Sequence, residues 1–174
     1  DEIWWDGALS RLVAQLSGRQ ADKHDLVVSP CYMAVGDIFH FQEEAAGKYK
    51  IYGREGHFNI RFIRNLPGLK VHGLYGNEGF SDRRSRKLQE LPKEKIFFSG
   101  DKYLHLSHLL RSTKQRSKHR YELGIPFPKD FYYPEVLFRP RPSVVPSPWR
   151  TMTDGYKLLA SMETPMKKVK RRLI

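Results

Sequence analysis

Apolar residues near the start of the chain recur at spacings of three and four, at Trp5, Ala8, Leu9, Leu12, Val13 and Leu16. This period is that of an amphipathic helix, which we expect from about Ile3 to Ser17, with Gly18 as a stop signal. After a polar turn, Leu26 to Ser29 has the pattern of a short buried strand, and Pro30 is expected to end it.

Alternation of apolar and polar residues is clearest from His57 to Asn65. This pattern predicts a strand, and one of its faces should carry Phe58, Ile60 and Phe62. A Pro-Gly pair turns this strand, and its expected partner is Leu69 to Tyr75. Further extended segments are expected at Tyr32 to Val35, Gly36 to Phe41, Lys48 to Tyr52 and Ile96 to Phe98.

The connections between these segments contain glycines and charged residues. Gly53 to Gly56 is expected to be a tight connection. Gly73 to Phe80 is expected to form a loop that approaches a ligand closely, because three glycines lie within it or at its start. Ser81 to Glu94 is charged and is interpreted as a loop or lid, and Ser117 to Leu123 as a short helix.

Prolines are concentrated late in the chain, where seven of the 11 lie between residues 126 and 149. Such a density excludes regular helix and central strand, so we expect an extended strap across the domain. Thr151 to Met166 is interpreted as a last short helix, followed by a frayed basic tail. The predicted organisation is therefore a unit at residues 1–125 and a strap, helix and tail at 126–174.

Composition favours a globular protein whose 174 residues form one domain or most of one. Strands separated by few helices predict an α/β class, with a mixed sheet and flanking helices. The net charge of +12 indicates an anionic partner. The excess lies in three clusters, at Arg83 to Lys87, Arg111 to Arg120 and Lys167 to Arg172. The single cysteine, Cys31, is interpreted as a small buried hydrophobe.

The stretch from Tyr103 to Ser112 contains two histidines three residues apart. If it is a strand, Tyr103 and His105 share one face, and if it is a helix, His105 and His108 do. A neutral imidazole is a ligand for divalent transition metals and an acid or base near neutral pH. The alternative is that His105 is a hydrogen-bonded core residue and His108 a surface one.

Several common sites are excluded by their missing motifs. One cysteine cannot supply the thiolates of a typical zinc site. The sequence has no Walker loop, no Gly-x-Gly-x-x-Gly, no Gly-x-Ser-x-Gly elbow and no recognised nucleic-acid module.

The order of the remaining motifs resembles the C-terminal half of family 2 glycosyltransferases, the inverting GT-A type. Asp1-Glu2 is similar to the end of that family's Asp-x-Asp motif, and a helix follows it. Arg61 to Arg64 resembles the Arg-Leu-Phe-Arg strand of the family. His72 to Glu78 loosely resembles the loop that often carries a His-Glu pair. Tyr103 to His105 resembles the late strand whose histidine completes the metal site.

The resemblance implies transfer of a sugar from a nucleotide-diphosphate donor to a glycan or lipid-linked acceptor. It implies a divalent Mn²⁺ or Mg²⁺ ion, for which the expected ligands are Asp1, His105 and His108. The other implied roles are diphosphate binding by Arg111 and Lys114 and substrate binding by Tyr75 and His72. The candidates for the catalytic base are Asp37, Glu43, Glu44 and Glu78. Asp37 and Glu78 are favoured, because each lies beside a glycine in a predicted loop at a strand end. The nucleotide-binding half of the family domain is absent from this sequence, so no transferase activity is expected from the chain alone.

A competing hypothesis is a basic module that binds nucleic acid or an anionic membrane without catalysis. Nucleic acid is the less favoured partner, because the aromatic residues lie in predicted buried strands rather than among the basic clusters. A third hypothesis combines the two functions, in a cytoplasmic transferase that its basic tail holds at the inner face of a membrane.

Overall fold

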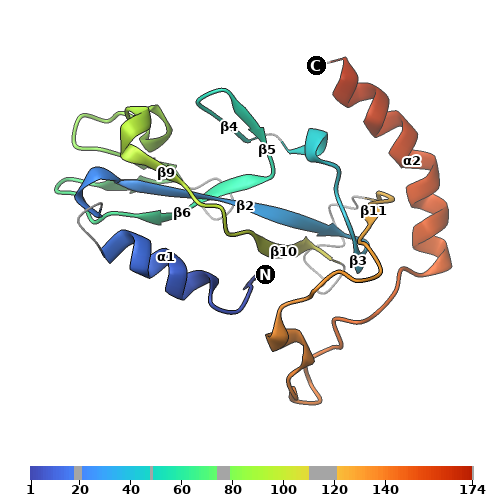
Figure 1. The fold of residues 1–174 in the computed structure, drawn as a ribbon. Coiled ribbons are helices and arrows are strands. Elements are labelled where there is room, and N and C mark those ends of the chain that lie inside the picture. The colour runs from blue at the N-terminus through green and yellow to red at the C-terminus, as the bar shows by residue number, and fades with distance from the viewer. Residues whose placement is uncertain (18–20, 48, 74–78, 110–120, 174) are drawn as a thin grey trace.

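The structure is a computed structural model that describes residues 1–17, 21–47, 49–73, 79–109 and 121–173. In this part of the chain the fold is mixed α/β, with a mixed seven-stranded sheet and two α-helices (Figure 1). The expectation of a mixed sheet with flanking helices is confirmed.

The sheet is built around one long strand, β2 (Leu26–Val35). The first half of β2 pairs with β6 (Phe58–Ile63), which is antiparallel, and with β9 (Ile96–Phe98), which is parallel. Its second half pairs with β3 (Asp37–Phe41), antiparallel, and β10 (Tyr103–His108), parallel. The short strands β1 (Glu2–Trp4) and β11 (Ile125–Pro126) extend the sheet beyond β10 and β3.

The prediction that Pro30 ends the first strand is wrong, because β2 continues through it to Val35. Proline lacks the amide donor that a strand interior normally uses. Pro30 lies where the parallel partner changes, between the last β9 pair at Val28 and the first β10 pair at Cys31. Along that edge no ladder hydrogen bond is therefore lost at Pro30.

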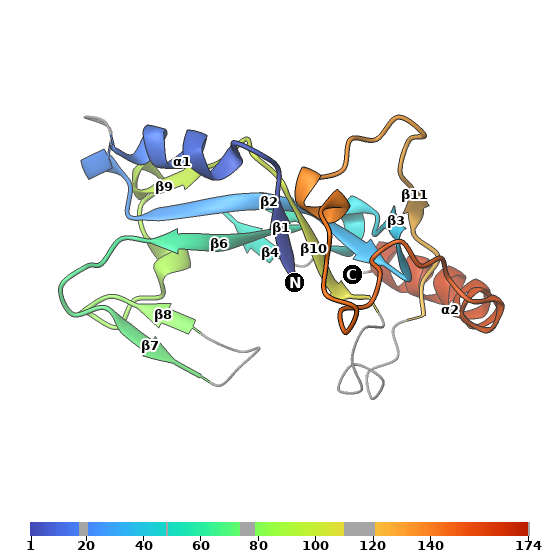
Figure 2. The ribbon, with the colours of Figure 1, turned by 90° about the horizontal axis from the view of Figure 1, so that it is seen from below.

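The helix expected from Ile3 begins later, since α1 spans Ala8–Ser17. Ile3 and Trp4 instead belong to β1, where pairing with β10 overrides the helical period of the sequence. Ala8 and Leu12 are the buried residues of α1. The ribbon places α1 alongside the β2–β9 part of the sheet (Figures 1 and 2).

Strand β6 contains a bulge that the alternation did not predict. Val27 pairs with Phe62 while Val28 pairs with Ile60, so Arg61 is the extra residue. The bulge reverses the alternation after Ile60. Ile63 packs with the core beside Phe58 and Ile60. Phe62, expected on that face, instead contacts the ring of Trp4 on the other side, 6.0 Å between centroids.

Two hairpins correct other expectations. Gly53 to Gly56 is not only a connection, because β5 (Arg54–Gly56) pairs with β4 (Tyr49–Ile51). In the described part of the segment after Pro67, up to Gly73, no residue pairs with β6. Instead β7 (Lys70–His72) pairs with β8 (Gly79–Ser81) as a separate two-stranded sheet.

Two buried clusters lie along the two halves of β2. The first contains Leu26, Val28, Ile51, Phe58, Leu88, Leu91 and Ile96. Leu88, which begins the 3-10 helix η3 (Leu88–Glu90), and Leu91 are buried in this cluster. The interpretation of Ser81 to Glu94 as a loop or lid is therefore wrong for this part. Further 3-10 turns are η1 (Ala21–Lys23), η2 (Glu44–Ala46) and η4 (Lys93–Lys95).

The second cluster joins β2, β3 and β10 to the proline-rich segment through Ala34, Ile38, Leu104, Leu106, Leu109, Phe127 and Leu137. In the fully described stretch from Phe127 to Thr153 the one regular element is η6 (Glu135–Phe138). The rings of Phe127 and Phe131 stack there, 3.9 Å between centroids. This segment thus shares its core with the sheet.

The last helix is longer than expected. α2 spans Asp154–Arg172 and includes the basic residues that were predicted to fray. Thr153 caps it by accepting a hydrogen bond from the amide of Tyr156. Within the described residues no helix combines the length and the hydropathy that crossing a bilayer requires.

Candidate functional site

The pairing of β1 with β10 brings together segments from opposite parts of the sequence. Glu2 pairs directly with His105, and the amide of Leu106 donates to the carbonyl oxygen of Asp1, 2.7 Å away. The expected proximity of Asp1 to His105 is therefore observed along the backbone. The prediction that Tyr103 to Leu106 is a strand is also confirmed, because this segment belongs to β10. The alternative, a helix that places His105 and His108 on one face, is therefore wrong.

Glu2 is the centre of a polar cluster on this face of the sheet. Its Oε1 atom lies 2.5 Å from Nη2 of Arg61 and 4.0 Å from Nε2 of His105. Arg61 is the extra residue of the bulge in β6, and its side chain lies on the same face of the sheet as Asn59. A carboxylate, an imidazole and a guanidinium are thus brought together by β1, β10 and β6.

The hydroxyl of Tyr103 holds two side chains of this face in place. Its hydroxyl accepts hydrogen bonds from Nδ2 of Asn59 at 2.7 Å and from Nε of Arg61 at 3.1 Å. Trp4 stacks on its ring, 5.0 Å between centroids. Tyr103 is fully buried, and burial raises the pKa of its phenol well above the ordinary value. It is therefore a neutral acceptor that holds Asn59 and Arg61 in place.

His105 is neutral at physiological pH. Burial, and then the positive charge of Arg61, lower the pKa of its imidazole to about 4. Its Nδ1 atom is buried and has no hydrogen-bond partner among the residues that the structure describes. A neutral ring with an unsatisfied nitrogen does not match the hydrogen-bonded core histidine of the alternative reading.

A groove of about 590 Å³ opens next to this cluster, between the sheet and the end of α2. Asn59 belongs to both, since it also lines the groove. The other lining residues include Cys31 and Met33 from β2, His108 from β10, and Lys167, Lys170 and Arg171 from α2. The groove is therefore lined by cationic side chains at the end that α2 forms and by His108 on the side of the sheet.

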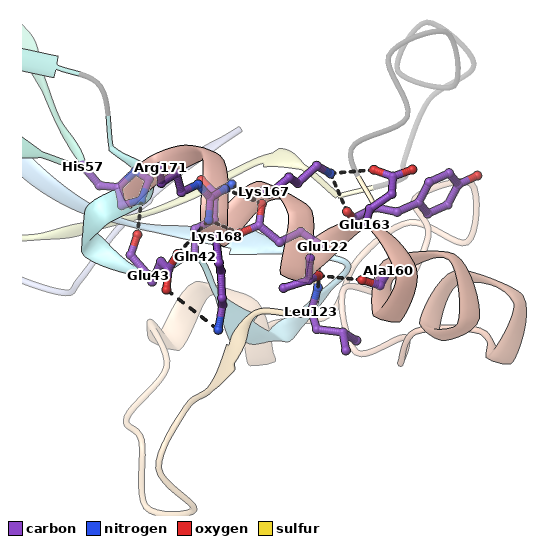
Figure 3. A network of polar contacts seen from close by, with 12 residues as sticks. Gln42, Glu43, His57, Glu122, Leu123, Ala160, Glu163, Lys167, Lys168 and Arg171 are labelled. Carbon is purple, nitrogen blue, oxygen red and sulfur yellow. Dashed lines mark hydrogen bonds and ion pairs between the residues drawn. The ribbon is translucent and has the colours of Figure 1, made fainter. Parts of the chain in front are cut away.

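Ion pairs fix the end of α2 beside the groove (Figure 3). Arg171 donates to both carboxylate oxygens of Glu122, at 2.7 and 2.8 Å, and also to Glu43. Gln42 donates a further hydrogen bond to Glu122. Burial alone would raise the pKa of Glu122, but the bonds from Arg171 and Gln42 outweigh it and lower that pKa. Lys167 is also engaged, with Glu163 and the carbonyl of Tyr121.

Asp37 lies apart from the Glu2 cluster, as the first residue of β3. It is 4 % exposed. Its Oδ1 atom accepts from the amide of Phe39 and contacts the His40 ring, and its Oδ2 atom accepts from the amide of Met152. These contacts join β3 to the segment before α2. The assignment of Asp37 as a base stays a prediction.

The remaining expected site residues divide into two groups. His72 ends β7, is exposed, and lies against Gly79 of β8. Tyr75, Glu78, Arg111 and Lys114 lie outside the described residues. Their predicted roles therefore stay predictions.

Sequence reasoning missed Arg61 and Asn59 as members of the cluster and treated Glu2 only as part of a motif. The available signal was a polar face on an otherwise apolar strand, with Asn59 and Arg61 alternating against Phe58 and Ile60. The partners of that face depend on strand register, which one sequence does not reveal.

Among the residues that the structure describes, no group of three or more histidine, cysteine, aspartate or glutamate side chains is arranged to hold a metal ion. Comparisons of the chain with family models, with curated proteins and with solved structures found no match. The function is therefore argued from the residues and their geometry.

Proposed function

We propose that this chain is the C-terminal half of a GT-A-type inverting glycosyltransferase, with the proline-rich segment as a strap across the domain. It would act on a nucleotide-sugar donor and a glycan or lipid-linked acceptor. The observation that supports this proposal is the β1–β10 pairing, which puts Asp1-Glu2 beside His105. The motif resemblance requires that juxtaposition, although the two segments are far apart in the sequence.

The donor set fits a divalent ion that is shared with a diphosphate. Mg²⁺ at phosphate sites commonly takes one or two carboxylates and completes its shell with phosphate oxygens and water. Mn²⁺ also accepts imidazole nitrogen. Asp1 or Glu2 would supply oxygen and His105 nitrogen. The ring nitrogen of His105 nearer Glu2 is Nε2, and its Nδ1 has no hydrogen-bond partner among the described residues. His108, on the groove wall, is the further candidate.

Such an ion would neutralise the negative charge that builds on the diphosphate as it leaves. The chain's own residues orient the site. Arg61 holds Glu2 on the face of His105, and Tyr103 and Asn59 hold Arg61. Arg111 and Lys114 are proposed to contact the diphosphate, and Tyr75 and His72 the sugars.

Inversion at the sugar carbon requires a carboxylate that accepts the proton of the acceptor hydroxyl. Asp37 and Glu78 remain the proposed bases. For Asp37, the backbone amides that it binds favour a structural contribution. Comparing Asp37→Asn with Glu78→Gln in the full-length enzyme separates the two, because only the base variant should lose turnover while keeping donor binding.

The metal hypothesis can be tested on the 174-residue chain with Mn²⁺ and inorganic pyrophosphate. Calorimetry should show Mn²⁺ binding that pyrophosphate strengthens, and NMR should show broadening of the His105 ring signals. Glu2→Gln and His105→Ala should each weaken binding at least about tenfold, the loss typical of perturbed metal sites.

His24→Ala is the matched control, because His24 contacts the carbonyl of Glu94 away from β1 and β10. It should leave Mn²⁺ affinity unchanged. Equal loss in His24→Ala and His105→Ala, or no binding by the wild-type chain, would contradict the proposed site. Thermal melts of each variant show whether a loss of binding reflects unfolding.

A further inference from the structure

Helix α2 presents two opposite faces. Tyr156, Ala160 and Thr164 form the inner face and are buried against the domain. Lys167 and Arg171 continue that face by i,i+3 and i,i+4 steps and form the ion pairs with Glu163 and Glu122. One side of α2 is therefore fully used in packing.

The outer face carries a stripe of large apolar side chains. Leu158, Met162, Met166, Val169 and Leu173 follow one another at spacings of four, four, three and four, and we call them the apolar stripe of α2. They are 57 to 81 % exposed. α2 lies along the outer edge of the molecule in both views (Figures 1 and 2). A contiguous exposed stripe of this kind marks an interaction surface.

Cations border the apolar stripe in the last turns of α2. Lys168, Lys170 and Arg172 are exposed. Lys168 lies 3.9 Å from Glu43, and within the described residues Lys170 and Arg172 form no ion pair. Asp154, the exposed acid of the first turn, is close to Lys157. The border of the stripe is therefore positively charged.

We propose that α2 lies in the plane of a membrane surface that contains anionic lipids, with the apolar stripe inserted at the boundary between headgroups and acyl chains. An in-plane amphipathic helix has an apolar face, a charged polar face and basic residues along its border. α2 meets each requirement, and as a 19-residue helix that cannot cross the bilayer it would lie flat. This surface does not depend on the transferase proposal.

Charge favours a lipid surface over a second copy of the chain as the occupant. The net charge is +12, so another copy brings further positive charge. Its acid at the start of α2 is already beside Lys157. Anionic headgroups instead complement Lys168, Lys170 and Arg172 while their acyl chains cover the stripe.

The contacts of α2 determine which of its cations are available to bind lipid headgroups. The five cations from Lys167 to Arg172 were expected to lie in a frayed tail that binds a membrane. Lys167 instead donates to the carbonyl of Tyr121, and Arg171 pairs with Glu122, so both side chains stabilise the docking of α2. Deleting Lys167 to Ile174 would thus disturb the fold as well as membrane binding, and substitutions on the outer face give the cleaner experiment.

The test is flotation of the 174-residue chain with vesicles of two compositions. One is phosphatidylcholine alone, and the other contains about 30 % phosphatidylglycerol, a fraction on the order of the anionic lipid content of natural membranes. The wild-type chain should bind the anionic vesicles, and more weakly at high salt. The double variant Met162→Glu, Met166→Glu should lose at least about tenfold in binding, because both charges would enter the apolar region. Lys170→Ala with Arg172→Ala should weaken binding to anionic vesicles alone.

The matched control is Leu9→Glu, Val13→Glu, which adds the same charges at exposed apolar positions of α1. This control variant should change vesicle binding by less than about threefold, because salt screens charges on α1 from the lipid headgroups. Equal losses in both double variants, or no binding by a folded wild-type chain, would overturn the proposal. A dimer that dissociates in the α2 variant, without vesicle binding, would assign the stripe to a second copy.

Discussion

Arg171 and Glu122 form a two-pronged ion pair in which each guanidinium nitrogen donates to a different carboxylate oxygen, at 2.7 and 2.8 Å. The pair joins the penultimate residue of α2 to the segment before β11. Glu122 is 3 % exposed, so removing its partner would leave a buried charge. The stability of this end of the protein therefore depends on the pair remaining intact.

Arg171→Ala should lower the free energy of unfolding by roughly 3 kcal/mol, the usual cost of removing one member of a buried pair. Urea denaturation measures this change. Lys157→Ala is the control, because Lys157 pairs with the fully exposed Asp154 and should contribute less than about 1 kcal/mol. If the two substitutions lowered the free energy of unfolding by similar amounts, the Arg171–Glu122 pair would contribute no more to stability than an exposed ion pair.

The same pair predicts a dependence of stability on pH. The folded pKa of Glu122 lies below its ordinary value of 4.5, so the unfolded chain takes up the proton first as pH falls. The stabilising contribution is thus complete above about pH 4.5 and is lost as pH falls through the lower folded value. The difference in unfolding free energy between wild type and Glu122→Gln should shrink from pH 7 to pH 3. A constant difference across that range would contradict the assignment.

Arg61→Ala should raise the pKa of His105 from about 4 towards its ordinary value of 6.5. Removing a nearby cation makes protonation of the ring easier, while burial, the larger cause, keeps the pKa below 6.5. NMR titration of the His105 ring protons measures the change. Arg54→Ala is the control, because Arg54 stacks on Phe98 and belongs to the separate two-stranded sheet of β4 and β5. An unchanged His105 pKa in Arg61→Ala would show that the two side chains are not coupled.

Gly36→Ala should destabilise the protein by about 1–3 kcal/mol, the range for a strained backbone position. Gly36 has a φ of +75°, and a Cβ atom there would lie 2.7 Å from the terminal methyl of Met152 and 2.8 Å from the Tyr156 ring. Gly100→Ala is the control, since a Cβ atom at Gly100 would meet no atom of the described residues within 4 Å. Thermal or urea unfolding measures both. Equal stability of the two variants would exclude close packing of α2 on the β2–β3 turn.

The sequence predicted those elements whose pattern is local. The period from Trp5 to Leu16 identified α1, and the apolar run at Ile96 to Phe98 identified β9. The alternation in Tyr103 to Leu106 assigned His105 and Leu104 to opposite faces, as the buried Leu104 shows. In each case the side chains of the element itself contain the information.

Features that depend on distant partners were not predictable in this way. Pro30 is tolerated inside β2 only because β9 ends and β10 begins there. The bulge at Arg61 is visible only in the register of β6 against β2, and the ion pair of Arg61 with Glu2 is visible only in the folded structure. Likewise, the basic end of α2 is helical because Glu122 and Glu43 meet Arg171. Pairing across the fold decides all three.

The position of β2 has a consequence for the order of assembly during synthesis. Its antiparallel partners β3 and β6 are complete once the chain reaches Ile63, whereas its parallel partners end at Phe98 and His108. Until then one edge of β2 has unpaired amide and carbonyl groups, the condition that promotes association between chains. Long-range parallel pairing is also slow to form. The nascent protein therefore passes through a half-sheet whose open edge is closed only when the strand that carries His105 arrives.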